Sequence, residues 1–325
     1  MRILITGGAG YIGSHIAEEL LKHNRIIILD NLSTGYKKLI FKKTKFYPTD
    51  IRDFDAVKKI IHNEKIDTII HLAAKLSLQE SKKKPKEYFY NNVLGTKNLL
   101  KAMRKTTVKN IIFSSTAAVY SGNKHTKFKE SHKPRPNNIY GRTKLNCEFL
   151  IKNFCKKNLI KFVILRYFNV VGASKSGRIG QLKNYGQLFK ILSKAIYKKN
   201  KKINIYGNNH LTPDGFCIRD FIDINDIVQI HSIIIKKLHT FSKGVILNCG
   251  YGKGLSVIKV VKTFEKIAKK KFLINILKKR KNEVSNIYAD NSKIKKKLKW
   301  EPEFNNLTLT IERCLKWEKK IINVK

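Results

Sequence analysis

The stretch RILITGGAGYIG, residues 2–13, decides the fold of this chain. Its first part, Arg2 to Thr6, is a short apolar run rich in β-branched residues, which is typical of a buried strand. Glycines follow at positions 7, 10 and 13, and a helical pattern continues from Tyr11 to His23. A strand, a glycine loop and a helix in this order predict the start of a doubly wound α/β sheet.

The alternation of short apolar runs with longer helical patterns continues to about residue 170. Parallel strands joined by helices produce this pattern, so we expect a Rossmann-type parallel sheet. The predicted strands are Ile3–Thr6, Ile26–Leu29, Lys45–Pro48, Thr68–Leu72, Asn110–Ser114 and Phe162–Arg166. The predicted helices are Tyr11–His23, Phe54–Asn63, Tyr90–Lys105 and Tyr140–Lys157.

The regular alternation weakens at a polar, glycine-rich stretch from Gly172 to Gly186. A chain of 325 residues is long enough for two domains. We predict a nucleotide-binding domain over residues 1–170 and a smaller mixed α/β domain, mainly for substrate binding, over residues 171–325. No repeat or low-complexity linker separates them.

The composition is that of a folded protein with a very basic surface. Lys and Arg number 68 against 23 Asp and Glu, a net charge of +45, while 42% hydrophobic residues exclude a disordered polyelectrolyte. The lysines are scattered rather than clustered, so two interpretations remain open. They reflect either a drift toward Lys, Ile and Asn codons or a general attraction for polyanions. We expect no specific nucleic-acid partner.

Cysteine usage and apolar segments indicate the compartment. The five cysteines are widely spaced and include no C-x-x-C pair, so we expect buried thiols and no metal site. The first apolar run is too short for a signal peptide, and no apolar stretch approaches the length of a membrane span. The sequence therefore predicts a cytoplasmic protein without a membrane partner.

The glycine loop carries the first functional signal. Gly7, Gly10 and Gly13 allow a tight turn, a close approach of backbone N–H groups to a pyrophosphate, and helix packing on the sheet. The positive end of the helix dipole would then face the anion. An ordinary strand–helix turn is the alternative interpretation of these glycines.

Asp30 ends the next predicted strand. A carboxylate at this position binds a ribose and repels a 2′-phosphate, which favours NAD over NADP.

Tyr140 and Lys144 carry the second signal, since residues four apart share one face of a helix. A neighbouring ammonium favours the phenolate, so we expect the pKa of Tyr140 to lie below 10 and the residue to act as a general base. The spacing alone is a common chance match. Thr116, however, follows an apolar strand at the end where ligands bind in open α/β sheets. We predict Thr116, Tyr140 and Lys144 as the catalytic residues.

Together these motifs resemble the extended short-chain dehydrogenase/reductases and, within them, the UDP-glucose 4-epimerases. The resemblance covers nearly the whole chain. Further matching motifs are Leu29-Asp30-Asn31-Leu32, Asp50-Ile51-Arg52-Asp53, Asn91-Asn92-Val93, Leu165 to Ala173, Ile218-Arg219-Asp220-Phe221 and Ala289 to Lys293.

The resemblance implies tightly held NAD and a reaction at C4 of a UDP-hexose. Tyr140 takes the proton of the 4-hydroxyl while the hydride leaves C4, Thr116 holds the 4-oxygen, and Lys144 also holds the nicotinamide ribose. Besides the glycines and Asp30, the implied NAD contacts are Tyr11, Ile12, Asn31, Asp50, Ile51, Leu72, Ala73, Asn91, Tyr140, Lys144 and Phe168.

For the UDP-sugar, the resemblance implies contacts from the second half of the chain, in addition to Thr116 and Tyr140. They are Asn169, Gln187, Leu188, Arg219, Arg280, Glu283 and Ile287. The arginines suit a diphosphate by charge and geometry. The resemblance also implies a homodimer formed through Tyr90–Lys105 and Tyr140–Lys157.

The chain departs from the family pattern mainly in its substrate half. Gln187 replaces an Asn, Glu283 replaces an Asp, and Leu76 or its neighbour Lys75 stands at a cofactor position. Ile287 replaces a bulky Tyr, which leaves room for an N-acetylated sugar.

The alternative functions are another nucleotide-sugar epimerase, acting on a uronate, pentose or N-acetylhexosamine, and a non-catalytic NAD sensor. Sugar-nucleotide dehydratases carry an acidic pair after the Thr, where this chain has Ala117-Ala118.

Overall fold

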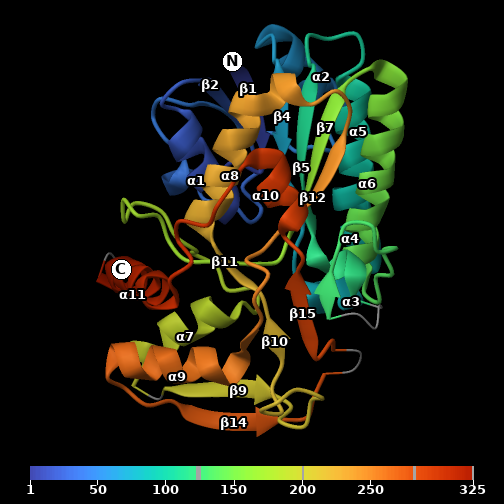
Figure 1. Cartoon of the computed structure of the whole chain (residues 1–325). Helices are drawn as coiled ribbons and strands as arrows, with labels where there is room; N and C mark the ends of the chain where they lie inside the picture. Colours follow the sequence, from blue (N-terminus) through green and yellow to red (C-terminus); the bar gives the residue numbers. More distant parts are fainter. Residues whose placement is uncertain (122–125, 200, 281–282, 324–325) are drawn as a thin grey trace. The chain divides into compact units, whose positions relative to one another are not determined.

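The computed structural model describes residues 1–121, 126–199, 201–280 and 283–323. The chain forms two compact units (Figure 1). The first comprises Met1–Asn123, Lys133–Tyr167 and Val228–Leu247, and the second Lys124–His132, Phe168–Ile227 and Asn248–Lys325. The expected boundary near residue 170 lies beside one junction, but the chain also crosses between the units at four other points.

The first unit is built on a seven-stranded sheet with the order β12-β7-β5-β4-β1-β2-β3. All adjacent pairs from β7 to β3 are parallel, which confirms the predicted Rossmann-type sheet. In the register, Ile3 of β1 lies between Ile26 of β2 and Thr68 of β4. The strands are β1 (Arg2–Thr6), β2 (Arg25–Leu29), β3 (Lys45–Tyr47), β4 (Thr68–His71), β5 (Asn110–Thr116), β7 (Lys161–Tyr167) and β12 (Val245–Cys249).

Both faces of this sheet are buried, which explains its continuous apolar strands. One face forms the core of the unit together with three helices, α2 (Phe54–Asn63), α5 (Gly95–Ala102) and α6 (Ile139–Asn158). The other helical segments that begin in this unit are α1 (Tyr11–Leu20), η1 (Lys37–Leu39), α3 (Leu78–Lys83), α4 (Pro85–Tyr88), the π-helical η2 (Phe89–Leu94), η3 (Ala117–Tyr120) and η4 (Leu238–Thr240).

The predicted elements of this half agree with the structure within a few residues. The helix predicted over Tyr90–Lys105 is a π-helical turn followed by α5, and α1 ends three residues before His23. Helix α8 (Ile224–Lys237) begins in the second unit and continues into the first.

The second unit contains three small sheets. They are formed by β13-β10-β15-β6, by β11 with β8, and by β14 with β9. Its core gathers apolar side chains from α7 (Leu188–Ile196), α9 (Val257–Ala268) and α11 (Leu307–Asn323). The remaining elements are β6 (Lys127–Phe128), β8 (Asn169–Val171), β9 (Lys202–Tyr206), β10 (Ile218–Arg219), β11 (Phe221–Asp223), β13 (Leu255–Ser256), β14 (Leu273–Leu277), β15 (Asn286–Ala289) and α10 (Ser292–Leu298).

Two further expectations concern the thiols and the helices. Cys147, Cys155, Cys217, Cys249 and Cys314 are all buried and form no disulfide, as predicted. In the described ranges, no helix combines the length and the hydropathy that crossing a bilayer requires.

A buried ion pair joins β7 to α6 in the first unit. The Arg166 guanidinium donates to both carboxylate oxygens of Glu148, at 3.0 and 2.7 Å. Ser115 on β5 also donates to Glu148, and Arg166 donates to the Tyr120 hydroxyl at 2.6 Å. Both charged side chains are at most 3% exposed. Because every charge here has a partner, the network fixes the ends of two neighbouring strands against α6.

We expect Glu148→Ala to lower the free energy of unfolding by about 3–5 kcal/mol, because Arg166 would keep a buried charge without its carboxylate. Glu19→Ala is the matched control, since Glu19 pairs on the surface with Lys22. Its loss should be below about 1 kcal/mol. Chemical denaturation measures both values. Equal losses in the two variants would contradict the assigned role of the buried pair.

Candidate active site

The glycine loop between β1 and α1 is a tight turn that only glycine can form at two positions. Gly7 has a positive φ of 75°, and a Cβ on it would lie 2.7 Å from the Ala73 nitrogen. A Cβ on Gly13 would lie 2.4 Å from the Gly7 oxygen. A Cβ on Gly10, in contrast, would meet only that oxygen, at 3.2 Å. Gly10 is therefore the position where a ligand can approach the backbone.

Helix α1 begins directly after this loop, so Tyr11 and Ile12 lie in its first turn. Gly10 is its N-cap and provides no side-chain hydrogen bond to the first-turn amides. The amides and the positive end of the helix dipole suit the pyrophosphate of a dinucleotide. The geometry of the loop therefore fits the predicted cofactor.

Asp30 follows β2 and fastens the glycine loop. Its carboxylate accepts the Ala9 N–H at 3.0 Å and the Leu32 N–H at 2.8 Å. Burial raises the pKa of Asp30, and these two amides oppose the shift. A Cβ on Gly35 would lie 2.9 Å from both carboxylate oxygens, so this glycine lets the chain pass close to Asp30. A carboxylate has lone pairs for the ribose hydroxyls besides these amides.

The residues predicted beside the adenosine form a second polar group. Asn31 donates to Asp50 at 2.8 Å, and Asp50 also accepts hydrogen bonds from the backbone and guanidinium of Arg52. The hydrogen bond with the Arg52 side chain is the largest cause that lowers the pKa of Asp50 to about 2. Ile51 is buried, and Gly95 on α5 packs against its side chain. Asp50 is thus held as a carboxylate.

The end of β4 places Leu72 and Ala73 beside the glycine loop. Leu72 donates its N–H to the Thr6 oxygen at 3.0 Å, and Ala73 is the residue that a Cβ on Gly7 would meet. Of the two candidates at the neighbouring cofactor position, Lys75 pairs with Glu87 at 2.7 Å, and Leu76 is exposed.

Asn91 and Asn92 lie in η2. Asn91 donates to the Asn92 side chain at 3.0 Å. Asn92 bonds both the N–H and the oxygen of Lys75 and donates to Thr143 on α6. Sequence reasoning gave Asn92 no role, although it stands in a matching motif.

Thr116 and Tyr140 meet at the carboxyl end of β5. Helix α6 starts here with Asn138 as its N-cap, whose side chain accepts the Gly141 N–H at 2.7 Å. A Cβ on Gly141 would lie 2.6 Å from the Ala118 oxygen, so this glycine lets the helix start against the turn after β5. The Thr116 side chain favours the charged form of Tyr140 and so acts to lower its pKa. Thr116 also accepts the Ala118 N–H at 3.1 Å.

Lys144 lies one turn further along α6 and is buried. Its ammonium donates to the Ser114 oxygen at 2.7 Å and lies 4.7 Å from the centre of the Phe113 ring. Burial lowers the pKa of Lys144 to about 8, while Cys147 and Glu148 oppose the shift. The ammonium therefore lies against the end of β5.

The pKa of Tyr140 differs from the sequence prediction. Burial raises it to about 12, and the Thr116 side chain only partly opposes the rise. Lys144 is not among the resolved causes, so the expected lowering of the pKa by Lys144 is wrong for the protein alone. The reason is that the i, i+4 spacing predicts proximity but says nothing about desolvation, which dominates in a buried site.

In the second unit, four of the predicted substrate residues lie together. Arg219 and Arg280 approach the same oxygen of Glu283, at 3.4 and 3.7 Å. Arg280 also stacks on Tyr206, with its guanidinium 3.8 Å from the ring centre. Ile287 on β15 pairs in register with Arg219 on β10. Two cations with one carboxylate leave an excess of positive charge, as a diphosphate site requires.

The other predicted residues of this unit occupy separate elements. Phe168 is buried and donates its N–H to the Cys249 oxygen, and the exposed Asn169 begins β8. Gln187 precedes α7, and its side chain accepts the Tyr185 N–H at 2.8 Å. Leu188 is the first residue of that helix.

Sequence reasoning missed a cluster beside Glu283. The Cys217 sulfur lies 3.3 Å from Nε2 of His210, and ligand atoms of these two residues and Glu283 lie within 4.8 Å of one another. Such a set can hold a metal ion, but Arg219 and Arg280 at Glu283 oppose a cation. We therefore assign no metal to it. The seven-residue spacing of His210 and Cys217 gave no recognisable metal signal.

Comparisons with known proteins agree with this geometry. Residues 3–250 match the NAD dependent epimerase/dehydratase family. A UDP-glucose 4-epimerase of Halalkalibacterium halodurans is 37% identical over 323 residues, covering 98% of this chain and 96% of that protein.

Two solved structures are similar over almost their full lengths. The UDP-glucose 4-epimerase of Bifidobacterium longum, in complex with NAD+ and UDP, has a TM-score of 0.92, 33% identity and 99% coverage of both chains. The UDP-Glc/GlcNAc 4-epimerase of Campylobacter jejuni has a TM-score of 0.86 and 37% identity, and the match covers 98% of this chain and 99% of that chain. The cofactor of the family is NAD, which the glycine loop and Asp30 fit.

Proposed function

The chain belongs to the NAD dependent epimerase/dehydratase family and is an NAD-dependent nucleotide-sugar 4-epimerase, and we propose that its substrates are UDP-galactose and UDP-glucose. The observation that carries the proposal is the buried Lys144 on α6. Its ammonium donates to the Ser114 oxygen on β5, the strand that ends at Thr116, and it lies one helical turn from Tyr140. A proton acceptor at the end of a parallel strand lies where ligands bind in such sheets.

Tyr140 is the proposed general base for the sugar 4-hydroxyl. Thr116 uses its oxygen to accept from Ala118, so its hydroxyl hydrogen can stabilise the phenolate form of Tyr140. The glycine loop, Asp30 and Lys144 would hold NAD, which would supply a hydride acceptor and a positive charge beside the sugar. Lys144 is buried one turn further along the same helix, and its side chain donates to the Ser114 oxygen on β5, which fixes its position.

Arg219 and Arg280 are the proposed contacts to the diphosphate. In the structure both arginines form ion pairs with one oxygen of Glu283. A diphosphate would offer them more negative charge and a bidentate geometry. We assign Asn169, Gln187 and Leu188 to the same substrate. Held by its diphosphate, the 4-keto sugar turns about that link and receives the hydride on its other face, so the two configurations interchange without net oxidation.

Among the alternatives, a dehydratase needs an acidic pair after Thr116. The structure has the apolar Ala117 and Ala118 there, in η3. A uronate or pentose epimerase would share the catalytic residues, so only the product identifies the sugar. A non-catalytic NAD sensor has no need of Thr116, Tyr140 and Lys144 together.

Incubation of the purified protein with UDP-galactose, followed by separation of the products, tests the proposed reaction. We expect UDP-glucose to form without added cofactor. Tyr140→Phe should lower turnover about 10²- to 10⁴-fold, because it removes the proton acceptor but keeps the ring. Its NAD content should not change. Tyr47→Phe is the matched control, since the Tyr47 hydroxyl bonds Glu64 on the sheet edge. Undiminished turnover in Tyr140→Phe would contradict the role of Tyr140 as the general base.

The pocket around Ile287 is proposed to accept N-acetylated sugars as well. Ile287 is 9% exposed and lies beside Arg219, one of the proposed diphosphate contacts. A branched aliphatic side chain leaves more room there than a tyrosine, although Tyr288 is its neighbour and could occupy the same space.

We expect the wild type to convert UDP-N-acetylglucosamine, and we expect Ile287→Tyr to lower this turnover selectively by steric overlap. Kinetics on both sugars measure the effect, with UDP-galactose as the internal control. Equal losses on the two substrates, or no wild-type activity on the acetylated one, would contradict the proposal.

A homodimer through η2–α5 and α6 is proposed. Phe89 and Tyr90 of η2 and Phe149 of α6 are large apolar side chains that are 44, 55 and 50% exposed. Exposed aromatic side chains of this size are typical of protein interfaces. Sedimentation velocity at micromolar concentration should show a dimer that Phe149→Glu converts to a monomer. A wild-type monomer would exclude this interface.

The cytoplasm is the proposed location of the reaction. Five buried cysteines that form no disulfide are typical of a reducing compartment. Disulfide-linked protein recovered from cells would contradict this location.

A further inference from the structure

The loop from Gly172 to Gln187 leads from β8 to two of the proposed substrate contacts, Gln187 and Leu188, and it is tied to a distant part of the chain. An antiparallel bridge between Ala173 and Gly180 closes its first half. The bonds that hold the loop in place come from helix α11, near the C-terminal end of the described residues.

Three side chains of α11 contact this loop directly. Lys320 donates to the Gly177 oxygen at 3.0 Å, and the Trp317 indole donates to the Gln181 oxygen at 3.1 Å. Gly180 lies against the Trp317 ring, where a Cβ would come within 2.5 Å.

The third contact is at the start of the loop, where the Cys314 thiol receives a hydrogen bond from the Gly172 backbone. Residues 314, 317 and 320 recur every three positions, so they share one face of the helix.

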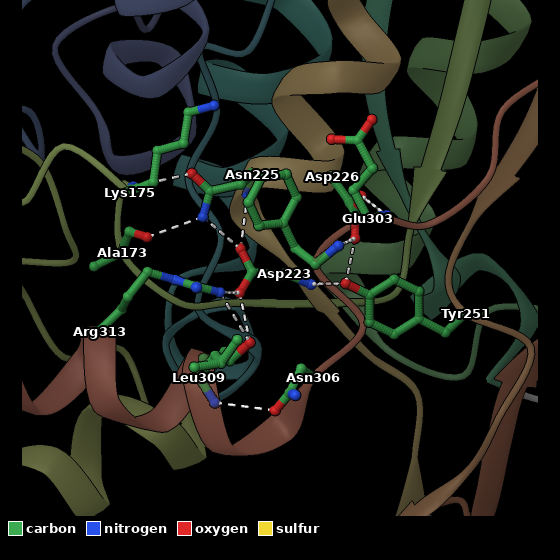
Figure 2. Close-up of polar contacts among 12 residues, drawn as sticks. Ala173, Lys175, Asp223, Asn225, Asp226, Tyr251, Glu303, Asn306, Leu309 and Arg313 are labelled. Atoms are coloured by element: carbon green, nitrogen blue, oxygen red, sulfur yellow. Dashed lines mark hydrogen bonds and ion pairs between the residues drawn. The ribbon is translucent and has the colours of Figure 1, made fainter.

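A fourth connection from α11 runs through a buried carboxylate (Figure 2). Arg313 and Thr310 both donate to one oxygen of Asp223, each at 2.6 Å. The other oxygen accepts from the Asn225 amide, which also donates to the Ala173 oxygen at 3.0 Å. Asn225 further accepts the Lys175 N–H at 3.2 Å. The first half of the loop is thus bonded to α11 through Asp223.

Helix α11 also fixes the chain beyond the substrate contacts. Glu318 pairs with Lys190 on α7 at 2.5 Å, and both side chains are only 4% exposed. Tyr197, just after α7, donates to the Leu315 oxygen at 3.0 Å. Gln187 and Leu188 therefore lie between two anchored points, six residues after Gln181 and two residues before Lys190.

We propose that α11 is the positioning element for Gln187 and Leu188, and that Trp317 and the Arg313–Asp223 pair are positioning residues for nucleotide-sugar binding. The proposal rests on the proposed function, in which these two residues contact UDP-sugar. None of the α11 residues lies in the unit that carries Thr116, Tyr140 and Lys144. Loosening α11 should therefore weaken substrate binding and leave the chemical step unchanged.

The test uses Trp317→Phe and Arg313→Met in the NAD-containing full chain. Trp317→Phe keeps an aromatic ring against Gly180, although a smaller one, and removes the N–H that holds Gln181. For each variant we expect KM for UDP-galactose to rise about 3- to 10-fold, as the loss of one anchoring hydrogen bond predicts. The kcat value should stay within about twofold. Arg313→Lys, which keeps a cation for Asp223, should recover most of the wild-type KM.

One control and one further test variant separate positioning from a general loss of structure. Lys319→Met changes a charged residue on the opposite side of α11 and should leave KM unchanged. Lys320→Met removes a surface bond that the fold does not need, so it tests the proposal even where Trp317→Phe unfolds the chain. Circular dichroism and NAD content report the integrity of each variant.

Calorimetric titration with UDP distinguishes failure of this proposal from failure of the proposed function. Weaker UDP binding in Trp317→Phe and Lys320→Met than in Lys319→Met supports the positioning role, whether or not UDP-galactose is turned over. Equal UDP affinity in all variants overturns the positioning role while the function stands. A wild type that binds no UDP overturns both proposals. A variant whose kcat falls while its KM stays unchanged overturns the positioning role.

Discussion

The buried pair of Glu148 and Arg166 is the interaction on which the chemistry of the first unit depends. It joins α6 to β7. Glu148 also accepts a hydrogen bond from Ser115, the residue that precedes Thr116 on β5. The proposed base and its neighbour on α6 are therefore held against the strand that carries their threonine. A buried ion pair adds little net stability over an apolar contact. Here it fixes the position of α6 against the two strands β5 and β7.

Burial sets the electrostatic state of the proposed catalytic residues Tyr140 and Lys144, and it works against charge on both. It raises the pKa of Tyr140 to about 12 and lowers the pKa of Lys144 to about 8, so both groups are pushed toward their neutral forms. The burial of the site therefore opposes charge on the phenol, and the Thr116 side chain is what the chain itself offers to favour it.

The second unit uses buried carboxylates in the same structural way. Asp220 accepts three backbone N–H groups, from Tyr251, Gly252 and Ala289, and burial raises its pKa to about 6. Asp223 binds Asn225 and α11, and Asp226 accepts from Tyr251, Glu303 and Phe304 (Figure 2). Acids at positions 220, 223 and 226 thus gather loops from distant parts of the sequence around β11. This arrangement orders a unit that has only small sheets.

The sequence by itself determined the parallel strands of the first unit from β1 to β7, and the cofactor, but not that residues 228–247 belong to this unit. Strand–loop–helix periodicity and the spacing of Gly7, Gly10 and Gly13 are local properties, and they placed β1, α1 and Asp30 correctly. The i, i+4 pair on α6 is local as well. Only the tertiary structure decided the pKa direction of Tyr140, because desolvation depends on what packs around the phenol. It also decided the bonds from Trp317 to Gln181 and from Arg313 to Asp223, since contacts over about a hundred residues leave no periodic signal in one sequence.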